Sequence, residues 1–247
     1  MRNIRRFTLM GLLLCGALLL TPTSWAQAPQ RAPLLDQVAK TFGVDSWDKV
    51  DAVRYTWNGE ITGLFKAAHK WEWEPKTGKV TFDGTGKDGK PVHVTYDSSQ
   101  LSSQPDQVKN EVEPSFINDN YWALFPLHAS WDKSASAIDQ GRFNLPLGAG
   151  TAELLPIKYP SEAGGFTPGD IWDLYIGKDN RVVYFVYNRG GSKPPSRVFA
   201  TWAGYKKAGP ILFSTEHMGF ADGKPLHIFL TDVAVKLAGS DQWIPAK

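Results

Sequence analysis

Apolar and polar residues alternate through residues 61–97, and this alternation predicts one long strand followed by a hairpin. His69, Trp71 and Trp73 fall on one face of the strand, while charged residues occupy the other face. A period of two is typical of a strand with one buried and one solvated face. The two return strands repeat the pattern and add Phe82 to the aromatic face. Three successive strands therefore present aromatic side chains toward one side, and another part of the chain has to cover them.

Short turns connect most of the predicted strands. Residues 75–78 (PKTG) and the dipeptides Asp88-Gly89 and Asp222-Gly223 carry turn chemistry. Strand patterns resume after residue 150, and the stretch 181–188 is apolar on both faces, which predicts a strand covered on both sides. The total is about nine or ten strands, which are antiparallel neighbours because their connections are short. One sheet with one apolar face has to curl around a helix or pack on a second sheet.

Helical patterns flank and interrupt the strands. Residues 34–42 carry apolar side chains at the spacing of an amphipathic helix, which Gly43 ends. Residues 107–121 predict short helices broken at Pro114, and residues 121–127 (YWALFPL) are strongly apolar up to and beyond a proline. The last segment is a candidate plug packed against the sheet, and ordinary core is the alternative.

The first 26 residues are expected to be a signal peptide. Three arginines precede an apolar run at residues 7–20, which is too short for a membrane-spanning helix. Residues 24–26 (SWA) fit the small-x-small cleavage pattern, and cleavage after Ala28 fits as well. We therefore predict a signal peptide at residues 1–26, a single domain at residues 27–247 and a periplasmic location. A retained N-terminal anchor is the alternative.

Removal of the signal peptide changes the charge balance. The chain has 27 basic and 25 acidic residues, and loss of the three arginines leaves 24 basic residues. This balance gives no sign of a nucleic-acid surface. The single cysteine, Cys15, lies in the apolar run, so the mature chain has no disulfide, thiol nucleophile or cysteine-ligated zinc. No other apolar run is long enough for a transmembrane span.

The search for catalytic motifs gives no G-x-S-x-G elbow and no H-E-x-x-H pair. The five histidines lack the spacing of metal ligands. We therefore predict no catalytic residue, no metal site and no cofactor. Glu72 and Glu74 share one face of a strand, where they form either a solvated pair or a carboxylate pair. If the protein is an enzyme, His69, Glu72 and His93 are the first candidates.

Aromatic residues are the most conspicuous feature of the sequence. Nine of the ten tryptophans remain once Trp25 is removed, and most alternate with aliphatic residues in strands. Such residues form either a large core or a curved, aromatic-lined cavity for an acyl chain or another apolar ligand. The candidate ligand-binding residues are Trp57, Phe65, Trp71, Trp73, Phe82, Trp122, Phe125, Trp172, Phe185, Trp202, Phe213 and Phe229.

Several segments together carry a family resemblance. They are the helix ending at Phe42-Gly43, the strand at residues 69–73 (HKWEW), residues 168–175 (PGDIWDLY), the turn at 178–181 (KDNR) and residues 229–233 (FLTDV). With the export signal, these segments resemble the LolA/LolB-like periplasmic lipoprotein carriers and their mycobacterial lipid-binding relatives. The resemblance implies a mainly β (α+β) fold. Its strongly curved antiparallel sheet would form an incomplete barrel around helical segments, which close the mouth over an apolar cavity.

We therefore predict an exported periplasmic protein that binds or carries an apolar ligand, which is a lipid, an acyl chain or a lipoprotein. Arg54, His69 and His217 are candidates for polar selection at the mouth of the cavity. One alternative is a periplasmic hydrolase or isomerase that uses carboxylates and histidines in the same cavity. Another is a structural envelope protein that binds a protein partner through an exposed edge strand.

Overall fold

The computed structural model describes residues 29–162, 167–191 and 193–247, so the predicted signal peptide lies outside the described residues. The helices are α1 (Pro33–Phe42), η1 (Val44–Lys49), η2 (Ser98–Ser103), η3 (Val108–Val112) and α2 (Glu113–Trp131). The first seven strands are β1 (Val50–Ile61), β2 (Phe65–Glu74), β3 (Lys79–Thr85), β4 (Pro91–Asp97), β5 (Ser136–Ala137), β6 (Arg142–Asn144) and β7 (Thr151–Lys158). The others are β8 (Ile171–Ile176), β9 (Val182–Asn188), β10 (Arg197–Thr201), β11 (Ala203–Ala208), β12 (Ile211–Ala221), β13 (Lys224–Leu237) and β14 (Trp243–Pro245).

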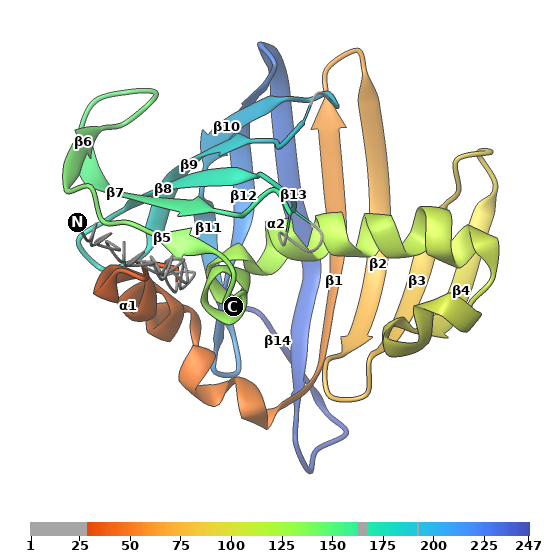
Figure 1. Cartoon of the computed structure of the whole chain (residues 1–247). Coiled ribbons are helices and arrows are strands. Elements are labelled where there is room, and N and C mark those ends of the chain that lie inside the picture. The colour runs from red at the N-terminus through yellow and green to blue at the C-terminus, as the bar shows by residue number, and fades with distance from the viewer. Residues whose placement is uncertain (1–28, 163–166, 192) are drawn as a thin grey trace, which may run out of the picture.

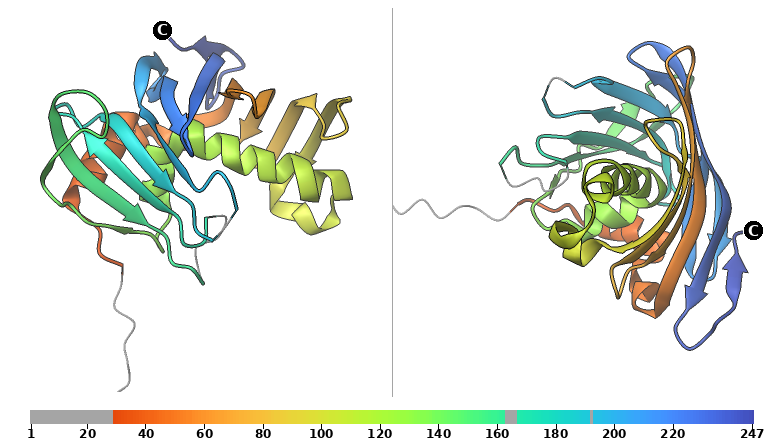
Figure 2. Two further views of the ribbon diagram at one scale, coloured as in Figure 1. Left: turned by 90° about the horizontal axis from the view of Figure 1, so that it is seen from above. Right: turned by 90° about the vertical axis from the view of Figure 1, so that its right-hand side faces the viewer.

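All of these strands belong to one sheet that curves around α2 (Figures 1 and 2). The strand order is β4-β3-β2-β1-β13-β12-β10-β9-β8-β7-β5, with β6, β11 and β14 paired alongside this path. The described ladders between these strands are antiparallel, and β4 and β5 at the two ends do not pair with each other. The predicted fold class, a strongly curved antiparallel sheet forming an incomplete barrel around helical segments, is therefore confirmed.

The sheet has fourteen strands, more than the nine or ten predicted. Three of the extra strands, β5, β6 and β14, have only two or three residues. Alternation over so few residues gives no recognisable pattern. In addition, the apolar stretch at residues 198–205 divides at Trp202 into β10 and β11, which both pair with β12.

The predicted faces of β2, β3 and β4 are confirmed. Trp71, Phe82 and Tyr96 are buried toward the concave side of the sheet, and Trp73 is partly buried there. Helix α2 covers this side, since Phe116 packs its ring 5.3 Å from that of Trp71. The aromatic face that opens the alternating sequence thus receives its cover from the helical insert.

The helical insert is one long element instead of the short helices expected from Pro114 and Pro126. Pro114 lies in the first turn of α2, where a proline costs no hydrogen bond and its fixed φ suits the helix. Pro126 lies inside α2 and cannot donate to the carbonyl of Trp122. The helix accommodates it with a kink at Leu124, whose φ and ψ are −132° and 20°, and then continues to Trp131.

The N-terminal helix α1 agrees with its prediction. It buries Leu35, Val38 and Phe42, and Gly43 ends it with a φ of 99°. A Cβ atom on Gly43 would lie 2.4 Å from the carbonyl oxygen of Pro210, so only glycine fits there.

Arg31 joins the start of the described chain to the end of α2. Its guanidinium donates hydrogen bonds at 2.8–3.2 Å to four backbone carbonyls, those of Ala129, Ser130, Asp132 and Ala135. The last carbonyls of a helix lack partners within the helix, and a cation there also suits the helix dipole. Arg31 therefore fixes the C-terminal end of the central helix.

Among the helices of the described residues, none combines the length and the apolar character needed to cross a bilayer.

Candidate functional site

Two adjoining cavities lie between the first half of α2 and one end of the sheet. The apolar cavity has a volume of about 240 Å³, and the basic cavity has a volume of about 340 Å³. Four residues line both cavities: Asn118, Trp122, Tyr187 and Arg189. The apolar cavity is completed by Trp57, Gly59, Glu60, Ile61, Leu64, Phe65, Pro195, Val198, Leu226 and Ile228. The basic cavity is completed by Pro114, Ile117, Tyr121, Thr167, Pro168, Asp170, Trp172, Gly190 and Lys193.

Trp57 forms a wall of the apolar cavity because β1 has a glycine two residues later. The indole lies over Gly59, where an added Cβ atom would come within 2.2 Å of the ring. The ring of His69 stacks on Trp57 at a centroid distance of 5.6 Å, and Phe65 lies 6.3 Å away. Only a glycine at position 59 lets the Trp57 ring lie this close to the backbone of β1. Gly59 and Trp57 together form the cavity wall at this end of the sheet.

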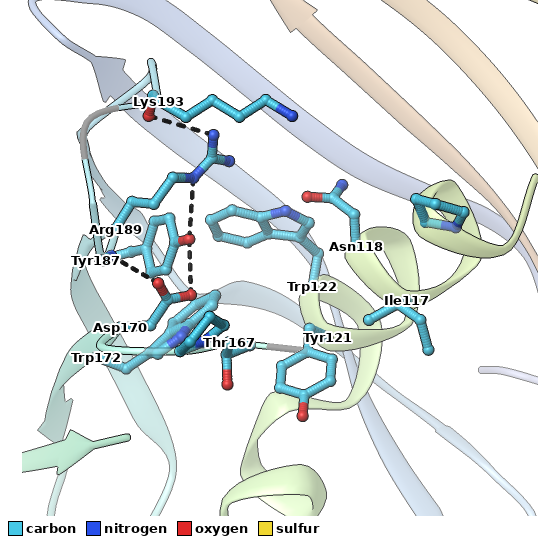
Figure 3. Close-up of a pocket in the computed structure, with 13 residues that line it drawn as sticks. Ile117, Asn118, Tyr121, Trp122, Thr167, Asp170, Trp172, Tyr187, Arg189 and Lys193 are labelled. Atoms are coloured by element: carbon cyan, nitrogen blue, oxygen red, sulfur yellow. Dashed lines mark hydrogen bonds between the residues drawn. The ribbon is translucent and has the colours of Figure 1, made fainter. Parts of the chain in front are cut away.

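Trp122 borders both cavities. It projects from α2 toward β8 and β9, where its ring lies 4.9 Å from that of Trp172 and 5.8 Å from that of Tyr187 (Figure 3). Its ring also lies 5.4 Å from that of Phe185. These edge-to-face and tilted contacts are favourable aromatic geometries. One side chain of α2 therefore both packs on the sheet and lines the two cavities.

A hydrogen-bonded chain crosses the basic cavity on the sheet side (Figure 3). Asp170 accepts a hydrogen bond from the hydroxyl of Tyr187 at 2.9 Å and another from the backbone N–H of Gly190 at 2.7 Å. Burial raises the pKa of Tyr187 to about 12, so its hydroxyl stays protonated and donates. Both carboxylate oxygens of Asp170 thus have internal donors.

Arg189 begins this chain and carries the positive charge that the two cavities share. Its Nε donates to the Tyr187 hydroxyl at 3.3 Å, and its Nη1 donates to the carbonyls of Lys193 and Pro194 at 3.4 and 3.0 Å. In the described ranges, no carboxylate forms an ion pair with Arg189 or with Lys193. With Arg189 and Lys193 against the one carboxylate of Asp170, the lining of the basic cavity carries an excess of one positive charge.

A buried histidine–aspartate pair lies on the other flank of α2. Asp119 is 1% exposed, and its Oδ2 accepts hydrogen bonds from His69 Nδ1 at 2.7 Å and from Trp71 Nε1 at 2.9 Å. Burial raises the pKa of Asp119, and the bonds from His69 and Trp71 oppose this rise. His69 also borders a third cavity of about 760 Å³, where the first half of β2 has no ladder partner on the β3 side.

The residues proposed for an enzyme lie on opposite faces of the sheet. His69 faces α2, whereas Glu72 and His93 share the outer face by strand register. His93 pairs there with Asp83 at 2.5 Å. No cluster of three or more potential metal ligands occurs in the part of the chain that the structure describes. The fold therefore does not bring these three residues together.

The twelve candidate ligand-binding residues divide into two groups. Those bordering the three cavities are Trp57, Phe65, Trp122, Trp172 and Phe229. Those in or against the packed core away from them are Trp71, Trp73, Phe82, Phe125, Phe185, Trp202 and Phe213. Alternation alone cannot distinguish the groups, because core and cavity side chains share the concave face of the strands, apart from Phe229, which lies on the other face of β13.

Of the three polar residues expected at the mouth, His69 borders the third cavity, whereas Arg54 and His217 lie elsewhere. Arg54 packs over Trp243 at 4.6 Å, on the face of β1 away from Trp57. His217 is fully buried against Trp202, with a ring distance of 4.4 Å. The sequence analysis missed Asn118 and Arg189. The available signal for Arg189 is its place directly after a doubly apolar strand and before two glycines, where a strand ends at the edge of the core.

Comparisons with known proteins give similarity in structure only. No protein-family model matches the chain, and no curated protein matches its sequence. A solved structure of a DUF1329 family protein from Desulfovibrio piger matches with a TM-score of 0.44 and 11% identity over 84% of this chain and 94% of that one. A LolA superfamily protein from Nitrosomonas europaea matches with a TM-score of 0.43 and 7% identity over 81% and 90%. The lipoprotein LppX from Mycobacterium tuberculosis matches with a TM-score of 0.31 and 9% identity over 81% and 94%.

The solved structures that are similar to this chain thus include a member of the LolA superfamily, which the sequence also resembles. At such low identities and TM-scores, the comparisons do not identify a ligand. The functional argument therefore rests on the cavities of this chain.

Proposed function

We propose that this protein is exported to the periplasm and binds or carries an apolar molecule, such as a lipid or an acyl chain, in the apolar cavity. The observation that carries the proposal is the cavity wall itself. Trp57 and Ile61 of β1, Phe65 of β2, and Leu226 and Ile228 of β13 share one face of three adjacent strands, and Trp122 of α2 lines the same cavity. Sites for small apolar ligands combine such walls with few polar groups.

The combined volume of the two cavities suits one acyl chain. Ligand pockets usually have volumes of about 300–1,000 Å³, and the two adjoining cavities together fall in this range. Burying an acyl chain of about 16 carbons contributes roughly 12 kcal/mol at about 0.8 kcal/mol per methylene. Association costs about 4 kcal/mol or more, so dissociation constants in roughly the micromolar range are expected.

Export and carriage are further parts of the proposal. The basic start, the apolar run and the SWA site at residues 24–26 support export. A carrier would exchange its ligand with another envelope component, and a lipoprotein or an envelope protein is the partner class we expect. A cavity at the open end of the sheet supports such exchange, because a ligand does not have to cross the packed core.

Native mass spectrometry and tryptophan quenching test ligand binding. Protein purified from the periplasm should retain a lipid, and after delipidation hexadecanoate should quench Trp57 and Trp122. Gly59→Ala should push the Trp57 indole into the apolar cavity and weaken binding by about tenfold. Gly84→Ala is the matched control, because its Cβ atom would meet Phe82 in the same way, at 2.4 Å, but away from the cavity.

Two results would contradict the proposal. One is a protein that emerges without lipid and does not respond to hexadecanoate or hexadecanol at about 100 micromolar, well above the range expected. The other is equal weakening by Gly59→Ala and Gly84→Ala at equal stability, which would place the bound ligand outside the apolar cavity.

A hydrolase is a second candidate function, favoured by the pair formed by His69 and Asp119. A buried aspartate bonded to Nδ1 fixes the tautomer and orientation of an imidazole, as general-base catalysis requires. Ser115 lines the same third cavity as His69. Turnover of p-nitrophenyl esters that Asp119→Asn and Ser115→Ala each abolish would support this function, and turnover unaffected by both would exclude it.

A further inference from the structure

We propose that Arg189 binds the anionic head group of the ligand, so that the preferred ligand is an amphiphile with a carboxylate or a phosphate at one end. This inference rests on the proposed function and specifies its substrate class. Arg189 lines both cavities, which places its guanidinium where an acyl chain in the apolar cavity would end. Arginine suits this role because its planar group binds carboxylate and phosphate in a bidentate manner.

The orientation of Arg189 is fixed on one side only. Nε is held by the hydroxyl of Tyr187, and Nη1 is held by the carbonyls of Lys193 and Pro194. Nη2 has no hydrogen-bond partner among the residues that the structure describes. A guanidinium that is already oriented loses less side-chain entropy when it binds an anion.

Two carboxylates also line these cavities, and each has partners of its own. Asp170 accepts hydrogen bonds from Tyr187 and from the backbone N–H of Gly190, which are neutral donors, so it keeps its negative charge beside Arg189 and Lys193. Glu60, on the rim of the apolar cavity, pairs with Lys66 at 3.2 Å.

The carboxylate of Asp222 also interacts electrostatically with Arg189, and it too has hydrogen-bond donors of its own. Asp222 accepts hydrogen bonds from the backbone N–H groups of Ser196 and Arg197. Lys193 adds a second positive charge to the basic cavity. Within the described part of the basic cavity, an anion would meet the two cations Arg189 and Lys193 against the one carboxylate of Asp170, which is an excess of one positive charge.

The proposal makes a definite statement about specificity. A neutral ligand of the same length would fill the apolar cavity but leave Arg189 solvated, whereas a cationic ligand would be repelled. We therefore expect the purified, delipidated protein to bind hexadecanoate and hexadecyl phosphate about 10- to 100-fold more tightly than hexadecanol. Hexadecyltrimethylammonium should bind more weakly than hexadecanol.

Displacement of a fluorescent fatty-acid probe from wild type, Arg189→Gln, Arg189→Lys and Arg54→Gln tests this proposal. Arg189→Gln should remove most of the preference for hexadecanoate and leave hexadecanol affinity unchanged. Arg189→Lys retains the charge and should keep part of the preference, which separates charge recognition from a role of Arg189 in holding its loop. Arg54→Gln is the matched control and should behave like wild type, because Arg54 lies on the outer face beside Trp243.

The outcomes distinguish this inference from the proposed function. Equal affinities for hexadecanoate and hexadecanol, unchanged in Arg189→Gln, would overturn the inference and leave apolar binding intact. Failure of every hexadecyl compound to bind would overturn both. Inorganic phosphate at millimolar concentration that competes fully with hexadecyl phosphate would show that the site takes the free anion, which also overturns the inference.

Discussion

Asp119 on α2 and His69 on β2 are joined by a contact of 2.7 Å between Oδ2 and Nδ1. The Asp119 side chain is 1% exposed, and the His69 side chain is 14% exposed. The same oxygen accepts the indole N–H of Trp71 at 2.9 Å. The central helix is therefore attached to the sheet by polar bonds as well as by aromatic packing. On the outer face of the same sheet, His93 and Asp83 form a similar pair that is exposed to solvent.

The Asp119–His69 pair and the exposed Asp83–His93 pair show how burial changes the contribution of such a pair to the free energy of unfolding. Asp119→Ala should lower the free energy of unfolding by about 3–5 kcal/mol, because it leaves buried His69 and Trp71 donors without an acceptor. Asp83→Ala should cost less than about 1 kcal/mol, since exposed pairs contribute little. Urea unfolding measures both values. Similar costs for the two variants would contradict the structural role assigned to Asp119.

Trp71 and Trp57 test the boundary between core and cavity. Trp71 is fully buried, and Trp71→Ala should cost about 3–5 kcal/mol. Trp57 borders an existing cavity and has fewer packing partners on that side, so Trp57→Ala should cost well under this range in delipidated protein. Equal losses at the two positions would indicate that no open space exists beside Trp57.

Helix α2 should respond to ligand in its first half only. Ile117, Asn118, Tyr121 and Trp122 line the cavities. Leu124, Phe125 and Leu127 are fully buried. We expect the backbone amides of residues 115–122 to exchange faster than those of β9, and to slow when hexadecanoate binds. Amides of residues 124–129 should be as protected as β9 with or without ligand. Uniform protection along α2, unchanged by hexadecanoate, would leave the helix a structural role alone.

Two buried histidines predict a loss of stability in weak acid. Burial lowers the pKa of His217 to about 4 and that of His128 to about 3, from an ordinary value of 6.5. Below pH 6.5 these two histidines bind protons in the unfolded chain but stay neutral in the folded chain. The free energy of unfolding should therefore fall as the pH drops from 6.5 toward 4, by up to about 1.4 kcal/mol per pH unit for each histidine.

His217→Gln should remove about half of this slope, as measured by urea unfolding between pH 6.5 and 4.5. The carboxyl of Asp119 has the opposite effect on the free energy of unfolding. Its pKa is raised in the folded state, so as the pH falls the folded chain binds this proton before the unfolded chain does, which stabilises the fold. Parallel pH profiles for wild type and His217→Gln would show that His217 is protonated in the folded protein.

The N-terminus provides a separate test of export. Periplasmic extracts should contain a chain that begins at Gln27, or at Pro29 if cleavage follows Ala28. N-terminal sequencing or intact mass measures this directly. An intact chain recovered from the inner membrane would contradict the prediction and favour a retained anchor.

The alternation of apolar residues predicted the strands well where a strand buries only its concave face, as β2, β3 and β4 do. It predicted the position of the aromatic rings of β2 and β3 for the same reason. It did not reveal which rings border open space, since that depends on α2 and on how far Trp122 reaches toward Trp172. The polar group at the junction of the cavities was also missed. Arg189 reaches the site through the curvature of the sheet, which no local pattern of residues encodes.

The open edges of the sheet bear on how a bound molecule would leave. In a closed barrel, the ladder hydrogen bonds run around the whole circumference, so the lumen widens only if a seam between strands tears. Here β4 and β5 end the sheet without pairing with each other. The sheet can therefore flatten by small changes of twist at each strand pair, and the space beside α2 can grow while every ladder bond remains intact.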